Sequence, residues 1–128
     1  MSVLREFAVG AIVPAQDMNR AIQFYQDVLG LEVVRVMDGG AQFQAGQGST
    51  IFVYPRPGGS PAEHTVAGWT VRDLYAAIDE LEARGVVFEQ YDLPGLQTDE
   101  RGVADVGGER AAWFKDSEGN ILSVGEFT

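Results

Sequence analysis

The sequence predicts an α+β fold made of two tandem βαβββ modules, with residues 1–59 as the first module and 60–128 as the second. Three observations support this prediction: a capped amphipathic helix between strand-like runs, a second copy of that unit, and two further strand-like runs after each copy. Because one such module cannot bury its own sheet face, we expect both modules to form one compact domain over 1–128.

The first helix is predicted by the stretch that runs from Asp17 to Gly30. Asp17 is of a residue type that accepts hydrogen bonds from the unpaired N–H groups of a first helical turn. Glycine is favoured just after the last turn because it adopts a left-handed backbone without a Cβ penalty. Between them, apolar residues recur three and four positions apart, as on a helix with one buried side; they are Met18, Ala21, Ile22, Tyr25, Val28 and Leu29. We expect a helix over Met18–Leu29.

The second helix repeats this pattern. Asp73 takes the place of Asp17, and Gly85 takes the place of Gly30 within one residue. The apolar positions between them are Leu74, Ala77, Ile78 and Leu81. The pattern predicts a helix over Asp73–Arg84.

The strands are predicted from runs rich in β-branched and aromatic residues. They are expected at Glu6–Val13, Leu31–Asp38, Ala41–Ala45, Thr50–Tyr54, Glu63–Val71, Val86–Gln90, Trp113–Lys115 and Ile121–Glu126. Pro14 is expected to end the first strand, because proline cannot donate to a ladder. Gly39-Gly40 predicts a hairpin, and the segment 55–61, rich in Pro and Gly, is the expected linker.

A long stretch, 92–108, is the one place where the two repeats differ in length. Loops of that size inside a compact domain are commonly functional. We expect it to act as a lid, with Tyr91, Leu93, Pro94 and Leu96 closing a binding site; the alternative is a disordered acidic insertion.

Composition excludes several classes of function. The absence of cysteine excludes disulfides, thiolate nucleophiles and Cys-based metal sites. No apolar run approaches the ~18 residues that span a membrane, and residues 1–6 lack the features of a signal peptide, so a cytoplasmic protein without a membrane partner is expected. The net charge is −10 and the nine basic residues form no patch, which argues against nucleic acid as a partner.

Two segments resemble the signature segments of a known group of proteins. Asp17 through Phe24-Tyr25 to Leu29-Gly30-Leu31, and Trp113 through Gly119-Asn120 to Leu122, are similar to those of the vicinal oxygen chelate (VOC) superfamily, the glyoxalase, bleomycin-resistance and extradiol-dioxygenase group. The resemblance covers nearly the whole chain. It implies that the two modules pair edge to edge and curl into a cup of mixed sheet, usually in a homodimer.

The resemblance also implies where a metal ion would be bound. Enzymes of the superfamily hold one divalent metal through His and Glu side chains from the first and last strand of each module. These positions fall on Ala8, Phe52, Val66 and Ser123. Three of these side chains offer no lone pair and a neutral hydroxyl is a poor ligand, so we expect no cofactor and no metal here.

His64 is the only histidine and therefore the only candidate for histidine catalysis. It lies two residues before Val66, in phase with it on a regular strand. Glu6 stands in the same relation to Ala8, whereas Glu126 would face the other way. A catalytic divalent site needs about three converging ligands, which this set does not provide; a solvent-exposed or satisfied His64 is the simpler interpretation.

Strand alternation and the resemblance together predict the lining of the cup. Tyr54, His64 and Thr70 lie in phase with the vacated positions Phe52, Val66 and Ser123. In related folds the position three before Asp116, here Trp113, also faces the cup, and Lys115 is nearby. Apolar walls with a few polar groups are typical of a site for a flat or amphipathic small molecule. The alternative is that the aromatic side chains fill the cup as core, although Gly10 and Gly68 would leave room there.

Two functions of different classes follow from this lining. The first is a metal-free protein, resembling the bleomycin-resistance branch, that binds a small organic molecule. The second is an enzyme of the superfamily type (lyase, isomerase or dioxygenase-like) that uses a displaced metal or His64 as acid or base. A ferredoxin-like α+β barrel is the alternative fold, but it would not explain the repeated Asp caps.

Overall fold

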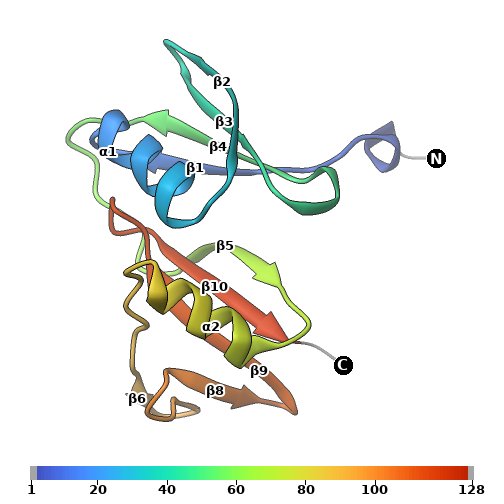
Figure 1. The fold of residues 1–128 in the computed structure, drawn as a ribbon, viewed down its shortest axis with the longest axis vertical. Coiled ribbons are helices and arrows are strands. Elements are labelled where there is room, and N and C mark those ends of the chain that lie inside the picture. Colours follow the sequence, from blue (N-terminus) through green and yellow to red (C-terminus); the bar gives the residue numbers. More distant parts are fainter. Residues whose placement is uncertain (1–2, 127–128) are drawn as a thin grey trace. The chain divides into compact units, whose positions relative to one another are not determined.

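The computed structural model describes residues 3–126 and separates into two compact units, Met1–Pro61 and Ala62–Thr128 (Figure 1). Each unit holds one four-stranded mixed sheet and one main helix. This confirms the α+β fold with two βαβββ modules. The division falls after Pro61, whereas the sequence placed it after Gly59. Met1 and Ser2, which belong to the segment considered for a leader, lie outside the described residues.

The sheet of the first unit has the strand order β1-β4-β3-β2. Its strands are β1 (Ala11–Ala15), β2 (Glu32–Met37), β3 (Gly40–Gln44) and β4 (Thr50–Pro55). β1 runs parallel to β4, and the other pairs are antiparallel. Two short 3₁₀ turns, η1 (Val3–Glu6) and η3 (Gly46–Gly48), complete the unit.

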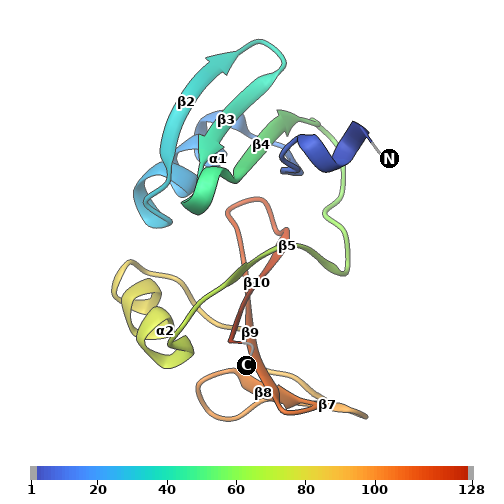
Figure 2. The same cartoon turned by 90° about the vertical axis from the view of Figure 1, so that its right-hand side faces the viewer.

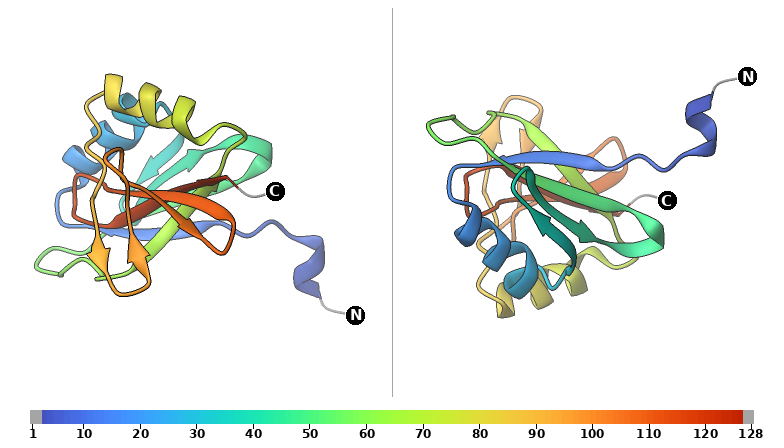
Figure 3. Two further views of the ribbon diagram at one scale, coloured as in Figure 1. Left: turned by 90° about the horizontal axis from the view of Figure 1, so that it is seen from below. Right: turned by 90° about the horizontal axis from the view of Figure 1, so that it is seen from above.

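The first helix covers one face of this sheet (Figure 3). α1 spans Met18–Gln23, and Asp17 accepts from the backbone N–H of Arg20 at 3.1 Å, which confirms the predicted cap. The chain then widens into a π-helical turn, η2 (Phe24–Val28), which the sequence pattern did not distinguish from α-helix. Tyr25 in this turn is fully buried, with its ring centroid 5.6 Å from that of Phe43 on β3.

The first strand differs from its prediction at both ends. It begins at Ala11 rather than Glu6, and it continues through Pro14 to Ala15. The carbonyl of Ala15 accepts from the N–H of Arg56, so Ala15 presents its polar backbone groups to β4. In a parallel pair, successive residues of one strand direct their backbone N–H and C=O groups to opposite sides, so the backbone of Pro14 faces away from β4. Because β1 is an edge strand, the missing N–H of Pro14 removes no hydrogen bond of the ladder.

The sheet of the second unit has the strand order β5-β10-β9-β8. Its strands are β5 (Thr65–Thr70), β8 (Val103–Val106), β9 (Glu109–Lys115) and β10 (Ile121–Glu126). The helix α2 (Leu74–Ala83) packs on one face of this sheet (Figure 2), burying Leu74 and Ile78. The side chain of Asp73 accepts from the N–H of Ala76 at 3.1 Å, which confirms the second cap.

The segment between α2 and β9 also differs from its prediction. Val86–Gln90 is not a strand: it makes one isolated bridge, from Phe88 to Phe114. The stretch 92–108 is not irregular, because it forms the small hairpin of β6 (Asp92–Leu93) and β7 (Leu96–Gln97) and then β8. β8 pairs with β9 at the sheet edge, the place that β2 takes beside β3 in the first unit.

The turn after the hairpin is held to α2 by Asp99. Its carboxylate accepts from the N–H groups of Arg101 (2.8 Å) and Val103 (2.9 Å) and from the hydroxyl of Tyr75 on α2 (2.8 Å). Burial would raise the pKa of Asp99, but these hydrogen bonds and the charge of Arg101 outweigh it and lower the pKa.

Arg101 makes a second attachment between the same turn and α2. Its guanidinium donates to Asp79 at 2.6 Å and to Glu82 at 2.8 Å. It also lies over the ring of Tyr75, 6.0 Å from the centroid. We call the contacts of Asp99 and Arg101 with α2 the α2 clamp.

No helix in the described residues 3–126 is long and apolar enough to cross a membrane.

The left-handed backbone after α2 gives a test of the fold. Gly85 has φ +97°, and a Cβ there would meet nothing within 4 Å. Gly85→Ala therefore adds backbone strain without a collision and should lower the free energy of unfolding by about 1–2 kcal/mol in urea denaturation. Gly39→Ala is the matched control, because its Cβ would also be in open space but its φ lies outside the left-handed range; an equal loss in both variants would contradict this explanation.

The α2 clamp predicts a pH-dependent contribution to stability. The pKa of Asp99 is lowered in the folded state, so its stabilising effect is present above the unfolded value of about 3.9 and is lost as pH falls through the folded pKa. Asp99→Asn should reduce stability at pH 7, and its difference from the wild type should shrink in acid. Urea unfolding from pH 7 to about pH 2.5 measures this; a difference that does not change with pH would refute it.

Candidate functional site

The sheet of the second unit has a face that points away from α2. On this face Gly68, Ser123 and Trp113 form a row, because Ser123 pairs directly with Gly68 on β5 and with Trp113 on β9. A Cβ built on Gly68 would collide with Ser123 Oγ, so the serine hydroxyl lies over the glycine. We call this row and its strand neighbours the Trp113 face. It combines the aromatic side chain of Trp113 with two small residues, Gly68 and the polar Ser123.

Trp113 is half-buried, and its neighbour Phe114 is buried on the opposite, α2 side. The ring of Tyr91 meets Trp113 edge-on, with centroids 5.8 Å apart and planes at 74°. The pKa of Tyr91 is raised, first by burial and then by the charge of Glu89, against the opposing effect of Lys115. Its hydroxyl therefore stays protonated at neutral pH and can donate a hydrogen bond.

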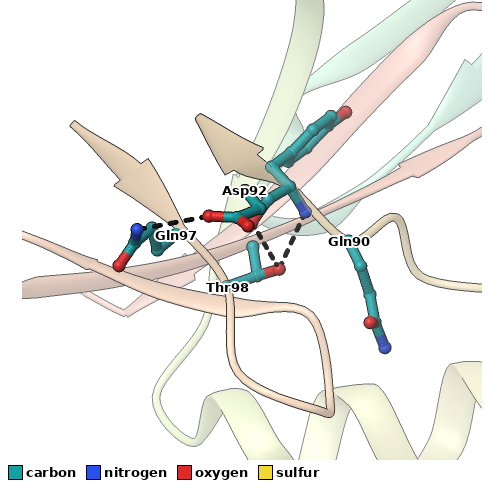
Figure 4. Close-up of a pocket in the computed structure, with 5 residues that line it drawn as sticks. Gln90, Asp92, Gln97 and Thr98 are labelled. Carbon is teal, nitrogen blue, oxygen red and sulfur yellow. Dashed lines mark hydrogen bonds between the residues drawn. The ribbon is translucent and has the colours of Figure 1, made fainter. Parts of the chain in front are cut away.

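A hollow of about 360 Å³ adjoins Tyr91. Its lining consists of Gln90, Tyr91, Asp92, Gln97 and Thr98, at the base of the β6–β7 hairpin (Figure 4). Sequence reasoning expected apolar lid residues here. Tyr91 does reach an aromatic partner, but Leu93, Pro94 and Leu96 do not line the hollow, and Leu93 is 52% exposed. The two amides and one acid of 90–98 are visible in the sequence, but no local pattern predicts that they line one hollow.

The other predicted lining residues of the second unit lie on or before β5. Val66 and Thr70 alternate with Gly68; Val66 is half-buried and Thr70 is exposed. His64 is exposed in the bend before β5, and its Nδ1 lies 3.2 Å from the carbonyl oxygen of Thr65.

The predicted lining residues of the first unit lie on β4. Phe52 and Tyr54 are half-buried and alternate with the buried residues Ile51 and Val53, so they point away from α1. The Phe52 ring lies over Gly40, where a Cβ would be 2.8 Å from Cζ. Phe52 and Tyr54 thus belong to a different sheet from Trp113 and Ser123.

The positions that the VOC resemblance assigns to a metal do not carry suitable donors. Ala8 lies before β1 rather than on it, which corrects the expected first strand. Gly10 stands seven residues before Asp17, the spacing of Val66 before Asp73, and it also lacks a side-chain donor. With Phe52, Val66 and Ser123 at the other positions, the residues present do not fit a divalent ion. Within residues 3–126 no group of three or more His, Asp or Glu side chains gathers as a metal site.

Glu126 lies on the α2 side of its sheet, as strand alternation predicted. Its carboxylate accepts from the N–H of Leu74 at 2.8 Å and from Arg110. The hydrogen bond from Arg110 is the main reason that the pKa of Glu126 is lowered. Glu126 therefore caps α2 and does not reach the Trp113 face.

Solved structures with the same fold cover nearly the whole chain. TnmS3, described as an antibiotic binding protein from a Streptomyces species, is 18% identical, with 93% of each chain covered and a TM-score of 0.63. The oxidase ChaP-H2 is 21% identical, with 93% of this chain and 91% of that chain covered and a TM-score of 0.63. A glyoxalase/bleomycin resistance protein from Catenulispora acidiphila is 22% identical, with 94% and 97% covered and a TM-score of 0.65. At these identities the likeness shows the fold alone.

No curated protein matches the sequence. The family model of the Glyoxalase/Bleomycin resistance protein/Dioxygenase superfamily matches residues 8–124, which is most of the chain. This match includes both segments that carry the resemblance, with the Asp17 cap in one and the turn at Asn120 in the other. The chain therefore belongs to the Glyoxalase/Bleomycin resistance protein/Dioxygenase superfamily.

Proposed function

We propose that the protein binds a planar or amphipathic organic molecule on the Trp113 face, without a metal ion. The observation that carries the proposal is the row of Gly68, Ser123 and Trp113. Trp113 lies beside Ser123, which pairs with Gly68, and Ser123 occupies a position where the superfamily's enzymes would present a metal-binding side chain. Flat rings stack favourably on tryptophan, and a nearby hydroxyl can orient a polar substituent.

The Tyr91–Trp113 pair supports this proposal. An edge-on contact holds the indole in one orientation, so less side-chain freedom is lost when a ligand stacks on it. Ser123 Oγ can both donate and accept a hydrogen bond. Glycine is required at position 68, because a Cβ there would collide with the hydroxyl of Ser123.

The relatives include an antibiotic binding protein and an oxidase, so the fold is compatible with binding and with catalysis. Binding is favoured here because the side chains at the metal positions offer no adequate donors. The enzyme alternative uses a displaced metal or His64 as acid or base, and Nδ1 of His64 lies near the backbone carbonyl of Thr65 rather than near an orienting carboxylate. We also propose that the protein acts as a homodimer in the cytoplasm.

Tryptophan fluorescence tests the proposed surface. Trp69 pairs with Val124 and points to the α2 side, so Trp69→Phe leaves Trp113 as the single tryptophan beside a nearly unchanged sheet. A neutral planar probe such as 2-naphthylmethanol should change the Trp113 emission of this variant saturably. Trp113→Ala should weaken probe binding, measured by calorimetry, by roughly 5- to 150-fold, as expected for the loss of about 1–3 kcal/mol of stacking.

The control for this test is Trp69→Phe itself, which should bind the probe as the wild type does. If Trp113→Ala retained full affinity, or if no planar probe in a broad set of metabolites and antibiotics altered the emission, the binding proposal would be rejected.

The metal-free part of the proposal has its own test. Elemental analysis of the purified protein should give no stoichiometric transition metal, and titration with Ni, Zn, Mn, Fe and Co ions should show no specific uptake. A chelator should leave probe affinity unchanged. A stoichiometric ion whose removal abolishes probe binding would instead favour a displaced metal site, and His64→Ala would then show whether the histidine is a ligand.

A further inference from the structure

The hollow at the base of the β6–β7 hairpin has walls that are fixed by hydrogen bonds of the hairpin. The N–H of Tyr91 donates to Thr98 Oγ1 at 2.8 Å, and the N–H of Thr98 donates to the Tyr91 carbonyl at 3.0 Å. The threonine hydroxyl also donates to that carbonyl at 3.3 Å. Thr98 therefore closes the base of the hairpin and uses its hydroxyl for this purpose, which leaves the other lining side chains to meet a ligand.

The two glutamines of the hollow have amide orientations that their partners dictate. Gln97 Nε2 lies 3.2 Å from Asp92 Oδ1, and Gln90 Nε2 lies 2.9 Å from the Glu100 carbonyl oxygen. A carboxylate and a carbonyl can only accept, so the nitrogen of each amide must face its partner. The Gln97 atom that faces away from its partner is Oε1, beside Oδ2 of Asp92, whereas the amide of Gln90 extends away from both residues (Figure 4). Gln97 Oε1 and Asp92 Oδ2 are both acceptors, and the second belongs to a negative charge.

The positive charge of Lys115, which acts on Tyr91, does not make the hollow attractive to anions. Lys115 Nζ lies 3.4 Å from Glu89 Oε1, so this basic group is already paired with an acid. An anionic substituent in the hollow would meet the Asp92 carboxylate without a matching cation among the lining residues. The net charge of −10 adds a long-range attraction for cations.

We propose that this hollow binds a cationic nitrogen group, an ammonium, amidinium or guanidinium, with Asp92 as its counter-ion and the side-chain oxygen of Gln97 as an acceptor. The inference rests on the proposed function, since Tyr91 lines the hollow and also contacts Trp113. A ligand whose planar part stacks on Trp113 can therefore place a basic substituent beside Tyr91, where the ring face also attracts a cation.

Three probes that differ in charge test the proposal: 2-naphthylmethylammonium, 2-naphthylmethanol and 2-naphthoate. Affinities are measured by NMR titration of ¹⁵N-labelled protein at low salt. The indole N–H of Trp113 reports stacking, and the side-chain NH₂ signals of Gln90 and Gln97 report the hollow. The cation should bind about tenfold more tightly than the neutral probe, from one partly exposed ion pair and a cation–π contact, and the anion should bind most weakly.

Asp92→Asn tests the counter-ion. Asparagine keeps an oxygen that can accept from Gln97, and the backbone bonds between Tyr91 and Thr98 do not involve position 92. The variant should bind the neutral probe like the wild type and should lose most of the preference for the cation. Asp38→Asn, in the exposed turn before β3, removes the same net charge from the first unit and should retain the preference.

The outcomes separate this inference from the proposed function. Equal affinity for cation and neutral probe, or a preference that survives Asp92→Asn, would overturn the cation site while Trp113 still reports stacking. If Trp113 did not respond to any probe, the proposed function would fail. The glutamine side-chain signals would then test the cation site independently of Trp113. Methylguanidinium should still shift these signals in the wild type, and signals that did not move would refute the cation site.

Discussion

The burial of α2 against one face of the second sheet is the constraint on which the candidate site depends. Leu74 and Ile78 of the helix are fully buried, as are Phe114 on β9 and Leu122 on β10. Side chains alternate along a strand, so burying these positions directs Trp113 and Ser123 to the other face. A shift of one residue in either strand would exchange the two sets. The hydrophobic core and the Trp113 face are thus consequences of the same register.

The α2 clamp extends this control to the inserted hairpin. The guanidinium carbon of Arg110 lies 5.3 Å from the ring centroid of Tyr75. From the turn after the hairpin, Arg101 also lies over this ring, and Asp99 accepts a hydrogen bond from the Tyr75 hydroxyl. The turn after the hairpin is therefore fixed to α2, while Tyr91, just before the hairpin, contacts Trp113. The pKa of Tyr75 is raised, mainly by its hydrogen bond to Asp99, which keeps the phenol protonated as the donor that the clamp requires.

Local signals were sufficient to predict the architecture. The caps at Asp17 and Asp73 and the left-handed glycines at Gly30 and Gly85 depend on backbone chemistry within a few residues, and all four are as expected. The end of the first strand was misplaced because an edge strand tolerates a proline such as Pro14. Which strand lies at the edge of the sheet depends on tertiary structure and could not be read from local sequence. Val86–Gln90 was misassigned because burial of alternate residues gives the same pattern whether or not a ladder forms.

The candidate site was predictable only in part. Alternation along the strand from Val66 predicted Gly68, and the resemblance to the superfamily predicted Trp113. Both residues lie on regular strands, where each pairs with Ser123. The polar hollow could not be predicted, because it depends on a two-residue ladder and on amide orientations set by Asp92 and by the carbonyl of Glu100. The residues at the metal positions could be read from the sequence, but their chemistry limits only one class of reaction and does not name a ligand.

The central claim, that planar molecules bind the Trp113 face without a metal, is tested most directly by a crystal structure of the protein grown with 2-naphthylmethanol and a chelator. The account predicts density for the naphthyl ring stacked on Trp113, with its hydroxyl near Ser123 Oγ and the ring above Gly68. Density on the α2 side, or a probe that appears only when a metal ion is restored, would contradict it.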